Sequence, residues 1–248
     1  MNISRRPRHY GFALLTGALL ISACATEPGT NTPAEPEMTV SNTDQAPPDL
    51  PAGQANSALL TATTAGDTAA VRAALTRRAQ VDTRDDAGRT PLMLAVLADD
   101  VPVARVLLEY GADPDARDDR GESPWVNTGV TGSVAMMEAL LPARPDLTLR
   151  NRFGGNALIP AAEKGHLDYV REVLRQTEID VDHVNDLGWT ALLEAVYYGD
   201  GSTVYRDIVQ VLVDAGADVG IRDAEGRTAY DHAVRRGFTD IAALVRPR

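Results

Sequence analysis

One eight-residue phrase recurs five times in this 248-residue chain and constrains its fold more than any other feature. The phrase opens with Asp or Asn and has Gly at its fourth position. It continues with Thr, Ser or Asn, then Pro or Ala, then Leu, Trp or Tyr. It occupies residues 85–92, 118–125, 151–158, 185–192 and 223–230, so its glycines are 33, 33, 34 and 38 residues apart. A period of this size predicts an array of similar units that bury a core between neighbours.

Each phrase predicts a tight turn followed by the start of a helix. In the first copy, Gly88 suits a backbone position with positive φ, and the Asp85 side chain can accept hydrogen bonds from its own turn. Thr90 is a preferred N-cap residue, and Pro91 is tolerated at the first helical position because its missing N–H has no partner there.

A second helix is predicted later in each unit. Val103, Val106 and Leu107 show the spacing of one apolar helix face. Gly111 and Gly216 fall where such a helix should end. Each unit is therefore expected to hold two helices.

This pattern resembles the ankyrin repeat, a turn followed by two antiparallel helices, over about residues 55–248. The resemblance implies an all-α solenoid of about six helix-turn-helix units. The first unit lacks the opening turn, and atypical end units are expected because each covers an open face of the stack. The expected units are 55–85, 86–118, 119–151, 152–185, 186–223 and 224–248.

The sequence departs from the family pattern in three ways, one of which is a single residue added near Thr177–Asp182. The family often has His after Thr-Pro-Leu, and here that position holds other residues, so more apolar packing between units is expected. About five residues are added near Gly201–Tyr205, and we expect them to form a loop between the two helices of the fifth unit, on a face often used for binding. The residues at the His position are Met93, Val126, Ile159, Leu193 and Asp231.

The N-terminus has the features of an export signal. Three arginines within residues 1–9 precede an apolar stretch over residues 10–23, which is shorter than the roughly 20 residues of a membrane-spanning helix. We therefore expect residues 1–23 to be a signal peptide.

The apolar stretch ends in Leu20-Ile21-Ser22-Ala23-Cys24, which resembles a bacterial lipobox. The resemblance implies cleavage before Cys24 and attachment of lipid to its thiol, and acyl chains on one residue anchor a protein durably. An ordinary signal peptide with an incidental cysteine is the alternative. Ala25, in place of Asp, implies the outer membrane, so the expected location is a lipid-anchored envelope protein facing the periplasm.

Residues 24–54 are rich in Pro, Thr and Asn and show no apolar periodicity, which predicts a disordered tether. The formal net charge of the chain is −11, and loss of three arginines with the signal peptide would make it more acidic. An acidic chain repels nucleic acid and anionic lipid, so we expect no nucleic-acid partner and membrane contact only through the lipid on Cys24.

The sequence offers few groups for catalysis or metal binding. Cys24 is the single cysteine, and the lipobox resemblance implies that its thiol carries the lipid. By resemblance, His166 is a structural turn residue. His183 lies near Asp180 and Asp182, an arrangement that could hold a cation but matches no known Ca²⁺ loop. Residues 129–133 are glycine-rich without a following Lys, and we interpret them as a shortened helix end. We expect no catalytic residue, no metal site and no cofactor.

The family binds partners through its turn tips and first helices, which implies a set of exposed positions here. Trp, Tyr and Arg often dominate binding energy, and aromatic residues collect in the fourth and fifth units. Our hypothesis places Trp189 and Tyr197 at the centre of a partner surface, and local packing is the alternative. Trp125 is expected in the core. The predicted partner-binding residues are Arg89, Arg120, Phe153, Glu163, Lys164, Trp189, Tyr197, Tyr198, Tyr205 and Arg227.

The sequence therefore predicts a monomeric, non-catalytic module that binds another protein, as an adaptor or a regulator. An immunity-type protein that binds and neutralises a toxin in the periplasm is the alternative. Fold alone does not choose between them.

Overall fold

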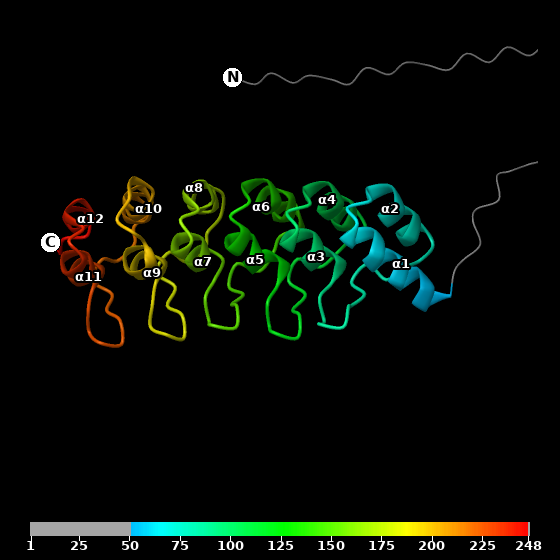
Figure 1. The fold of residues 1–248 in the computed structure, drawn as a ribbon, viewed down its shortest axis with the longest axis horizontal. Coiled ribbons are helices and arrows are strands. Elements are labelled where there is room, and N and C mark those ends of the chain that lie inside the picture. The colour runs from blue at the N-terminus through cyan, green and yellow to red at the C-terminus, as the bar shows by residue number, and fades with distance from the viewer. Residues whose placement is uncertain (1–50, 248) are drawn as a thin grey trace, which may run out of the picture. The chain divides into compact units, whose positions relative to one another are not determined.

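The computed structural model describes residues 51–247, which contain twelve α-helices, one short 3₁₀-helix and no strand (Figure 1). The predicted signal peptide, Cys24 and nearly all of the predicted tether lie outside the described residues. The α-helices are α1 (Ala52–Thr64), α2 (Thr68–Thr76), α3 (Pro91–Leu97), α4 (Val101–Glu109), α5 (Pro124–Thr131), α6 (Val134–Leu140), α7 (Leu158–Glu163), α8 (Leu167–Gln176), α9 (Ala191–Tyr198), α10 (Thr203–Asp214), α11 (Ala229–Arg236) and α12 (Thr239–Leu244), and the 3₁₀-helix is η1 (Leu141–Ala143).

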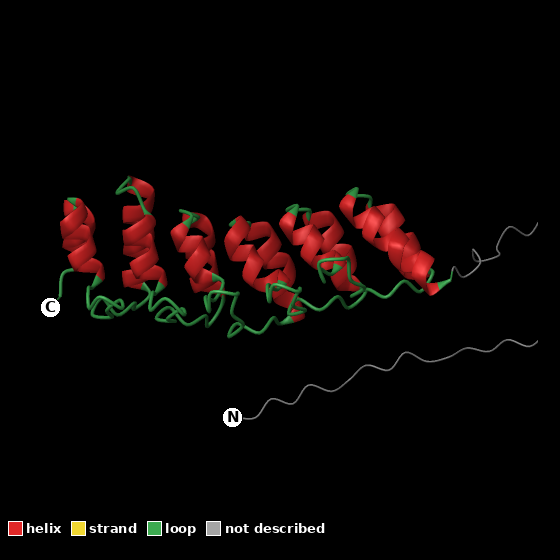
Figure 2. Ribbon diagram, turned by 60° about the horizontal axis from the view of Figure 1, so that its bottom comes forward, coloured by secondary structure: helices red, strands yellow, loops and turns green. Residues whose placement is uncertain are grey.

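The helices form six pairs that lie in a row, as the sequence predicted. Each helix packs against its partner in the pair and against the equivalent helix of the next pair. The odd-numbered helices form one layer, the even-numbered helices form a second, and the long turns project from the odd-numbered layer (Figures 1 and 2). The buried apolar residues form one continuous cluster through all six pairs, so the core runs between the two layers.

The recurring turn is held by its first side chain. In the first copy, Asp85 Oδ1 accepts hydrogen bonds of 2.9 Å from the N–H groups of Ala87 and Arg89. The equivalent oxygens of Asp118, Asn151, Asn185 and Asp223 accept the same two bonds in their own turns. The glycine of each phrase has a φ between +72° and +80°. The predicted turn is thus confirmed in all five copies.

The predicted helix caps are also present. Thr90, Ser123, Thr190 and Thr228 each accept a hydrogen bond on the side-chain oxygen from a backbone N–H three residues later. Asn156 replaces them in the fourth unit, where its Oδ1 accepts from the N–H of Ile159 at 3.3 Å. Each cap supplies a partner for a backbone group that the helix leaves unpaired.

Carboxylates join consecutive units along the turn side of the stack. Asp82 Oδ1 accepts a 3.1 Å hydrogen bond from the N–H of Asp113, which lies one unit further along. Asp182 accepts an equivalent bond of 2.8 Å from Asp218. Some of the acidic turn residues therefore connect units.

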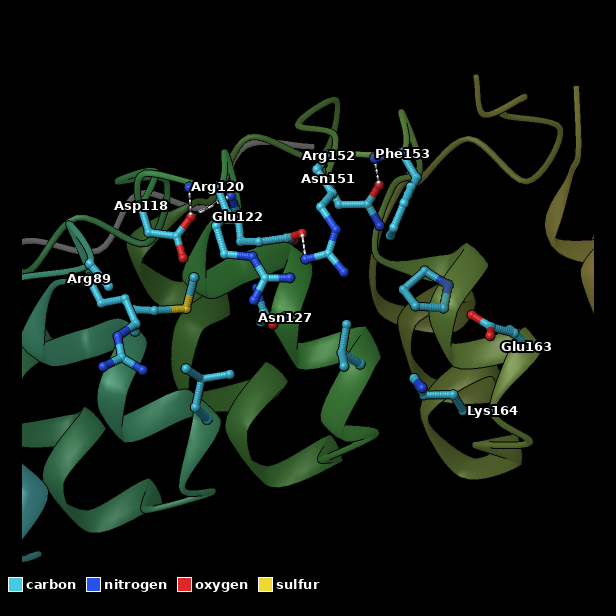
Figure 3. A pocket seen from close by; sticks show the side chains of 15 residues that line it. Arg89, Asp118, Arg120, Glu122, Asn127, Asn151, Arg152, Phe153, Glu163 and Lys164 are labelled. Carbon is cyan, nitrogen blue, oxygen red and sulfur yellow. Dashed lines mark hydrogen bonds and ion pairs between the residues drawn. The ribbon is translucent and has the colours of Figure 1, made fainter. Parts of the chain in front are cut away.

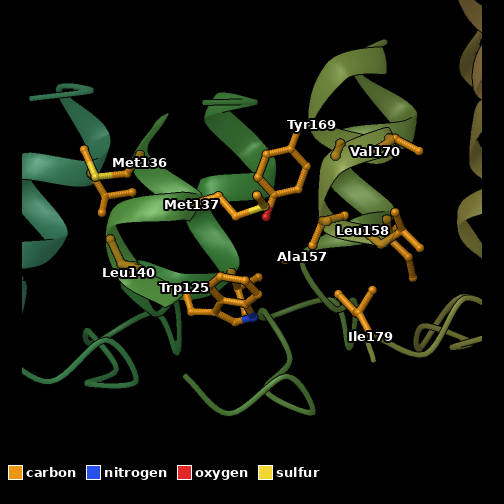
Figure 4. Packing of buried hydrophobic residues seen from close by; sticks show 14 of the residues in the cluster. Trp125, Met136, Met137, Leu140, Ala157, Leu158, Tyr169, Val170 and Ile179 are labelled. Carbon is orange, nitrogen blue, oxygen red and sulfur yellow. The ribbon is translucent and has the colours of Figure 1, made fainter. Parts of the chain in front are cut away.

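The centre of the core contains two large ring systems (Figure 4). Trp125, in the first turn of α5, is fully buried, as predicted. Tyr169 is fully buried as well, and its hydroxyl donates a 2.6 Å hydrogen bond to Thr128 Oγ1, whose own proton goes to the Trp125 carbonyl. A buried hydroxyl is stable here because it has a partner.

The glycine-rich stretch at residues 129–133 differs from the expectation of a shortened helix. α5 continues through Gly129 to Thr131 and ends at Gly132, which has a φ of +70°. A Cβ on Gly129 would lie 1.8 Å from the carbonyl oxygen of Ala157, so the glycine allows α5 to lie directly against the residue that precedes α7. Close packing, and not fraying, explains its presence.

Two details of the structure differ from the expectation. The helical domain begins at Ala52, so the last residues assigned to the tether belong to α1. The addition in the fifth unit lengthens a helix more than a loop, because α10 begins at Thr203 and has 12 residues where α4 has nine. Tyr205 is therefore in the first turn of α10.

Candidate functional site

An open hollow of about 520 Å³, here termed the large hollow, lies along the second, third and fourth units. It is bordered by the turns of these units and by α3, α5 and α7 (Figure 3). Its wall combines charged side chains of the turns with apolar side chains of the helices. Leu97 and Phe153 expose 46% and 51% of their surface there. Five of the predicted partner-binding residues line it, namely Arg89, Arg120, Phe153, Glu163 and Lys164.

Charge pairs order one side of the large hollow. Arg152 forms an ion pair with Glu122 at 3.2 Å, and its guanidinium carbon lies 4.5 Å from the centre of the Phe153 ring. Burial, followed by the nearby Asp118 carboxylate, raises the pKa of Glu122. Arg152 thus crosses from one turn to the previous one and fixes the Phe153 ring.

The other cations of the large hollow form no ion pair with another turn among the described residues. Arg89 pairs with Asp85 of its own turn at 2.7 Å. Over residues 51–247, no ion pair engages Arg120 or Lys164, and both side chains are exposed. The hollow therefore presents two cations to solvent beside exposed apolar surface.

A second hollow of about 240 Å³, termed the small hollow, lies between the turns of the fourth and fifth units and α7 and α9. Phe153 and Glu163 line both hollows, and Tyr198 lines only the small one. Glu194 of α9 also lines it although only 5% of the residue is exposed. Glu194 Oε1 accepts a 3.0 Å hydrogen bond from Asn185 Nδ2.

Three of the five predicted aromatic residues, Trp189, Tyr197 and Tyr198, contact one another. The ring centres of Trp189 and Tyr197 are 4.3 Å apart at right angles, and those of Tyr197 and Tyr198 are 5.0 Å apart. His232 of the sixth unit adds to the cluster, with its ring centre 5.8 Å from Trp189. Trp189 is half-buried, whereas Tyr197 and Tyr198 are 41% and 52% exposed, so local packing and an exposed surface coexist here.

The last two predicted residues, Tyr205 and Arg227, line neither hollow. Tyr205 is half-buried and donates a hydrogen bond of 2.9 Å to the Glu163 carbonyl, with its ring against Gly199. Arg227 is half-buried and pairs with Asp223 at 3.2 Å and with Glu225. Both side chains have structural partners within the stack.

The sequence analysis missed three polar side chains at the fourth position after a helix cap. This position holds Asn127, Glu194 and His232 in the third, fifth and sixth units. Glu194 bonds to Asn185 at 3.0 Å, and His232 Nε2 lies 2.6 Å from Asp223 Oδ2, so each bonds to the first residue of its own turn. A comparison of the units at this one position would have found them, because Leu94 is the equivalent residue in the second unit.

The remaining histidines have structural contacts. His166 precedes α8, and its Nε2 lies 3.2 Å from the Val130 carbonyl oxygen. His183 Nε2 lies 2.6 Å from the Gly154 carbonyl oxygen. Within the described part of the chain, no cluster of three or more His, Cys, Asp or Glu side chains has a geometry that could hold a metal ion.

None of the helices between residues 51 and 247 combines the length and the hydrophobicity needed to cross a bilayer.

Comparison with known proteins agrees with this geometry. The family model "Ankyrin repeats (3 copies)" matches residues 37–118 and 129–223. The ankyrin repeat protein YahD of Escherichia coli (strain K12) is 46% identical over 112 residues, which are 45% of this chain and 56% of YahD. The mouse ankyrin repeat and SAM domain-containing protein 6 is 34% identical over 102 residues, which are 40% of this chain and 11% of that protein. The chain thus spans about half of YahD and a small part of the second relative.

Solved structures show the same fold. EF0377, an ankyrin repeat protein, has a TM-score of 0.74 and 42% identity, covering 77% of this chain and 96% of its own. An ankyrin repeat domain from Acinetobacter baumannii AYE has a TM-score of 0.73 and 40% identity, covering 75% and 95%. The ankyrin repeat domain of Bcl-3, a member of the IkappaB family, has a TM-score of 0.68 and 29% identity, covering 76% and 85%. The six helical pairs, the five equivalent turns and these matches together show that the chain belongs to the ankyrin repeat family.

Proposed function

We propose that this chain is a non-catalytic adaptor or regulator that binds another protein through the large hollow, while a lipid on Cys24 holds it on the periplasmic side of a bacterial outer membrane. Ankyrin repeats are protein-interaction modules in general, and the family to which the chain belongs supports the first part of this proposal.

The large hollow is the observation that carries the proposed binding function. It spans three units, is open, and combines the unpaired cations Arg120 and Lys164 with the exposed side chains of Leu97 and Phe153. Protein interfaces combine an apolar centre with charged residues at the rim, and Arg and aromatic residues are enriched in them. An extended surface of this kind suits a protein partner.

A site-specific crosslink tests the binding surface. A photoreactive benzoyl-phenylalanine replaces Phe153 in the full chain, which is expressed in its own bacterial envelope and irradiated. The matched control carries the same group at Arg171, which is exposed on α8 of the same unit but away from the turns. We expect a discrete adduct with another protein from position 153 and not from position 171. The same adducts from both positions, or none from position 153, would contradict the proposal.

The lipid anchor is tested separately. The apolar stretch and the five residues that end at Cys24 support the proposal, together with Ala25 for the outer membrane. We expect labelled palmitate to enter the full chain, and the Cys24→Ser variant to lose the label and leave the outer-membrane fraction. Unchanged fractionation of Cys24→Ser would refute the anchor while leaving the binding surface untouched.

A further inference from the structure

The small hollow contains a carboxylate in an unusual setting. Glu194 is 5% exposed, and within residues 51–247 it forms no ion pair with Lys, Arg or His. Its one hydrogen bond comes from the neutral amide of Asn185. A buried carboxylate that lacks a cation is unfavourable, since its charge is removed from water without compensation.

A second carboxylate makes this arrangement still less favourable for the free protein. Glu163 of α7 lines the same hollow and has no ion pair among the described residues. Burial, followed by repulsion from Glu163, raises the pKa of Glu194 to about 7. The titratable groups that face Glu194 are Glu163 from α7 and Tyr198 from the last turn of its own helix. A cation between these groups would relieve the repulsion.

The rim of the small hollow is apolar and largely aromatic. Phe153, Leu187 and Tyr198 line it and are 51%, 57% and 52% exposed. A guanidinium stacks well on aromatic faces, and its planar fork matches a carboxylate. Arg152, which lines the large hollow but not the small one, already stacks on the Phe153 ring.

The size of the small hollow favours a single side chain. Its volume of about 240 Å³ lies below the range of roughly 300–1,000 Å³ that is usual for small-molecule pockets. It nevertheless exceeds the share of one liquid water, about 30 Å³, several-fold. A long side chain with a charged end and an apolar stem fits such a space.

We propose that the small hollow is a socket for an arginine side chain of the partner protein, with the guanidinium against Glu194 and Glu163 and the stem between Phe153, Leu187 and Tyr198. This inference rests on the proposed function, because it assigns the chemistry of the partner at one end of the same surface. The socket is continuous with the large hollow through Phe153 and Glu163.

The test uses the lipidated full chain in detergent micelles and N-acetyl-arginine amide as the probe. The backbone amide signals of Leu187 and Tyr198 are followed by NMR during the titration. We expect saturable shifts with the arginine probe and none with N-acetyl-citrulline amide, which has nearly the same shape and no charge. Equal shifts with the citrulline probe, or no shift with the arginine probe, would overturn the assignment.

Variants locate the binding group. We expect Glu194→Gln to weaken arginine binding about tenfold, as loss of a charge-assisted hydrogen bond implies, while the amide retains its contact with Asn185. Glu109→Gln, on the exposed side of α4, is the matched control and should bind as the parent chain does. Tyr198→Ala, at an exposed position, should also weaken binding and serves if Glu194→Gln unfolds. Unchanged binding in both Glu194→Gln and Tyr198→Ala would refute the socket.

The dependence on pH gives an independent readout. A bound guanidinium requires ionised Glu194, so arginine binding should tighten from about pH 6 to about pH 8. An affinity that stays constant over this interval contradicts the proposal.

If the crosslink from position 153 succeeds while the arginine titration fails, only the socket is wrong. If the crosslink fails, the proposed function itself is wrong.

Discussion

Gly129 provides a direct test of how closely the units pack. Helix propensity alone predicts that Gly129→Ala stabilises the protein by about 0.5–1 kcal/mol, because the residue lies inside α5. The structure predicts the opposite. The added Cβ would lie 1.8 Å from the Ala157 carbonyl oxygen and 2.8 Å from its carbonyl carbon, and both of these are backbone atoms. No side-chain rotation can relieve this contact, so α5 must move away from the start of α7.

The magnitude follows from these two opposing effects. Overpacking a core costs typically 1–3 kcal/mol and occasionally more, and a backbone contact this short belongs at the upper end of that range. After subtraction of the propensity gain, we expect Gly129→Ala to lower the free energy of unfolding by about 2 kcal/mol. Because units contact only their neighbours, the third and fourth units should also uncouple, and the unfolding transition should broaden.

The assay is urea unfolding of the full chain followed by far-ultraviolet circular dichroism. Gly53→Ala is the matched control, since Gly53 is exposed in α1 and a Cβ there would meet no atom within 4 Å. The control should be neutral or slightly stabilising. A Gly129→Ala midpoint equal to or above that of the parent chain would refute the close contact between α5 and the start of α7.

Three further predictions address single contacts. Tyr169→Phe removes the hydroxyl that donates the 2.6 Å hydrogen bond to Thr128 Oγ1. It should lower the free energy of unfolding, measured in urea, by about 0.5–1.5 kcal/mol. An unchanged free energy of unfolding would show that this hydrogen bond contributes nothing. Burial opposes ionisation of Asp223, yet hydrogen bonds from the Arg227 N–H, His232 and the Arg227 guanidinium lower its pKa to about 2. Because the pKa is depressed, this stabilisation is present above the unfolded pKa near 4 and is lost as the pH falls towards about 2. Asp223→Asn should therefore make the free energy of unfolding depend less on pH at the acid end. A pH dependence parallel to that of the parent chain would contradict this. Trp189→Ala removes a ring that packs edge-on against Tyr197 and lies beside the His232 ring, so it should lower the thermal midpoint. An unchanged midpoint would support a purely exposed role.

The parts of the fold that local contacts determine were predictable from the sequence. The turn that opens with Asp85 is closed by hydrogen bonds to residues two and four positions later, and the cap at Thr90 bonds three positions later. A short stretch of sequence therefore contains all the interacting groups. The same reasoning failed for α10, whose first turn contains Tyr205, because the Tyr205 hydroxyl bonds to the carbonyl of Glu163, 42 residues earlier, and local sequence does not reveal such a contact.

The candidate site was predictable only in part, for a related reason. Exposed positions such as Arg120 and Phe153 follow from their place in the repeat, and both line the large hollow. The hollows themselves form between units. Arg152 reaches Glu122 across 30 residues of sequence, and the side chains around Glu194 come from two turns and two helices. Position within one repeat carries no information about such pairs.

The carboxylates that join consecutive turns have a consequence for how such a protein can change its length. Asp82, Asp115 and Asp182 each accept a hydrogen bond from one backbone N–H of the following unit. The acceptor is thus an aspartate at the same place in the first, second and fourth units. A gene duplication that adds one whole repeat would therefore supply both halves of the new joint. A duplication whose length is not a whole period would leave a carboxylate or an N–H without its complement. Recombination between repeats is thus constrained to whole periods by the chemistry of the joints.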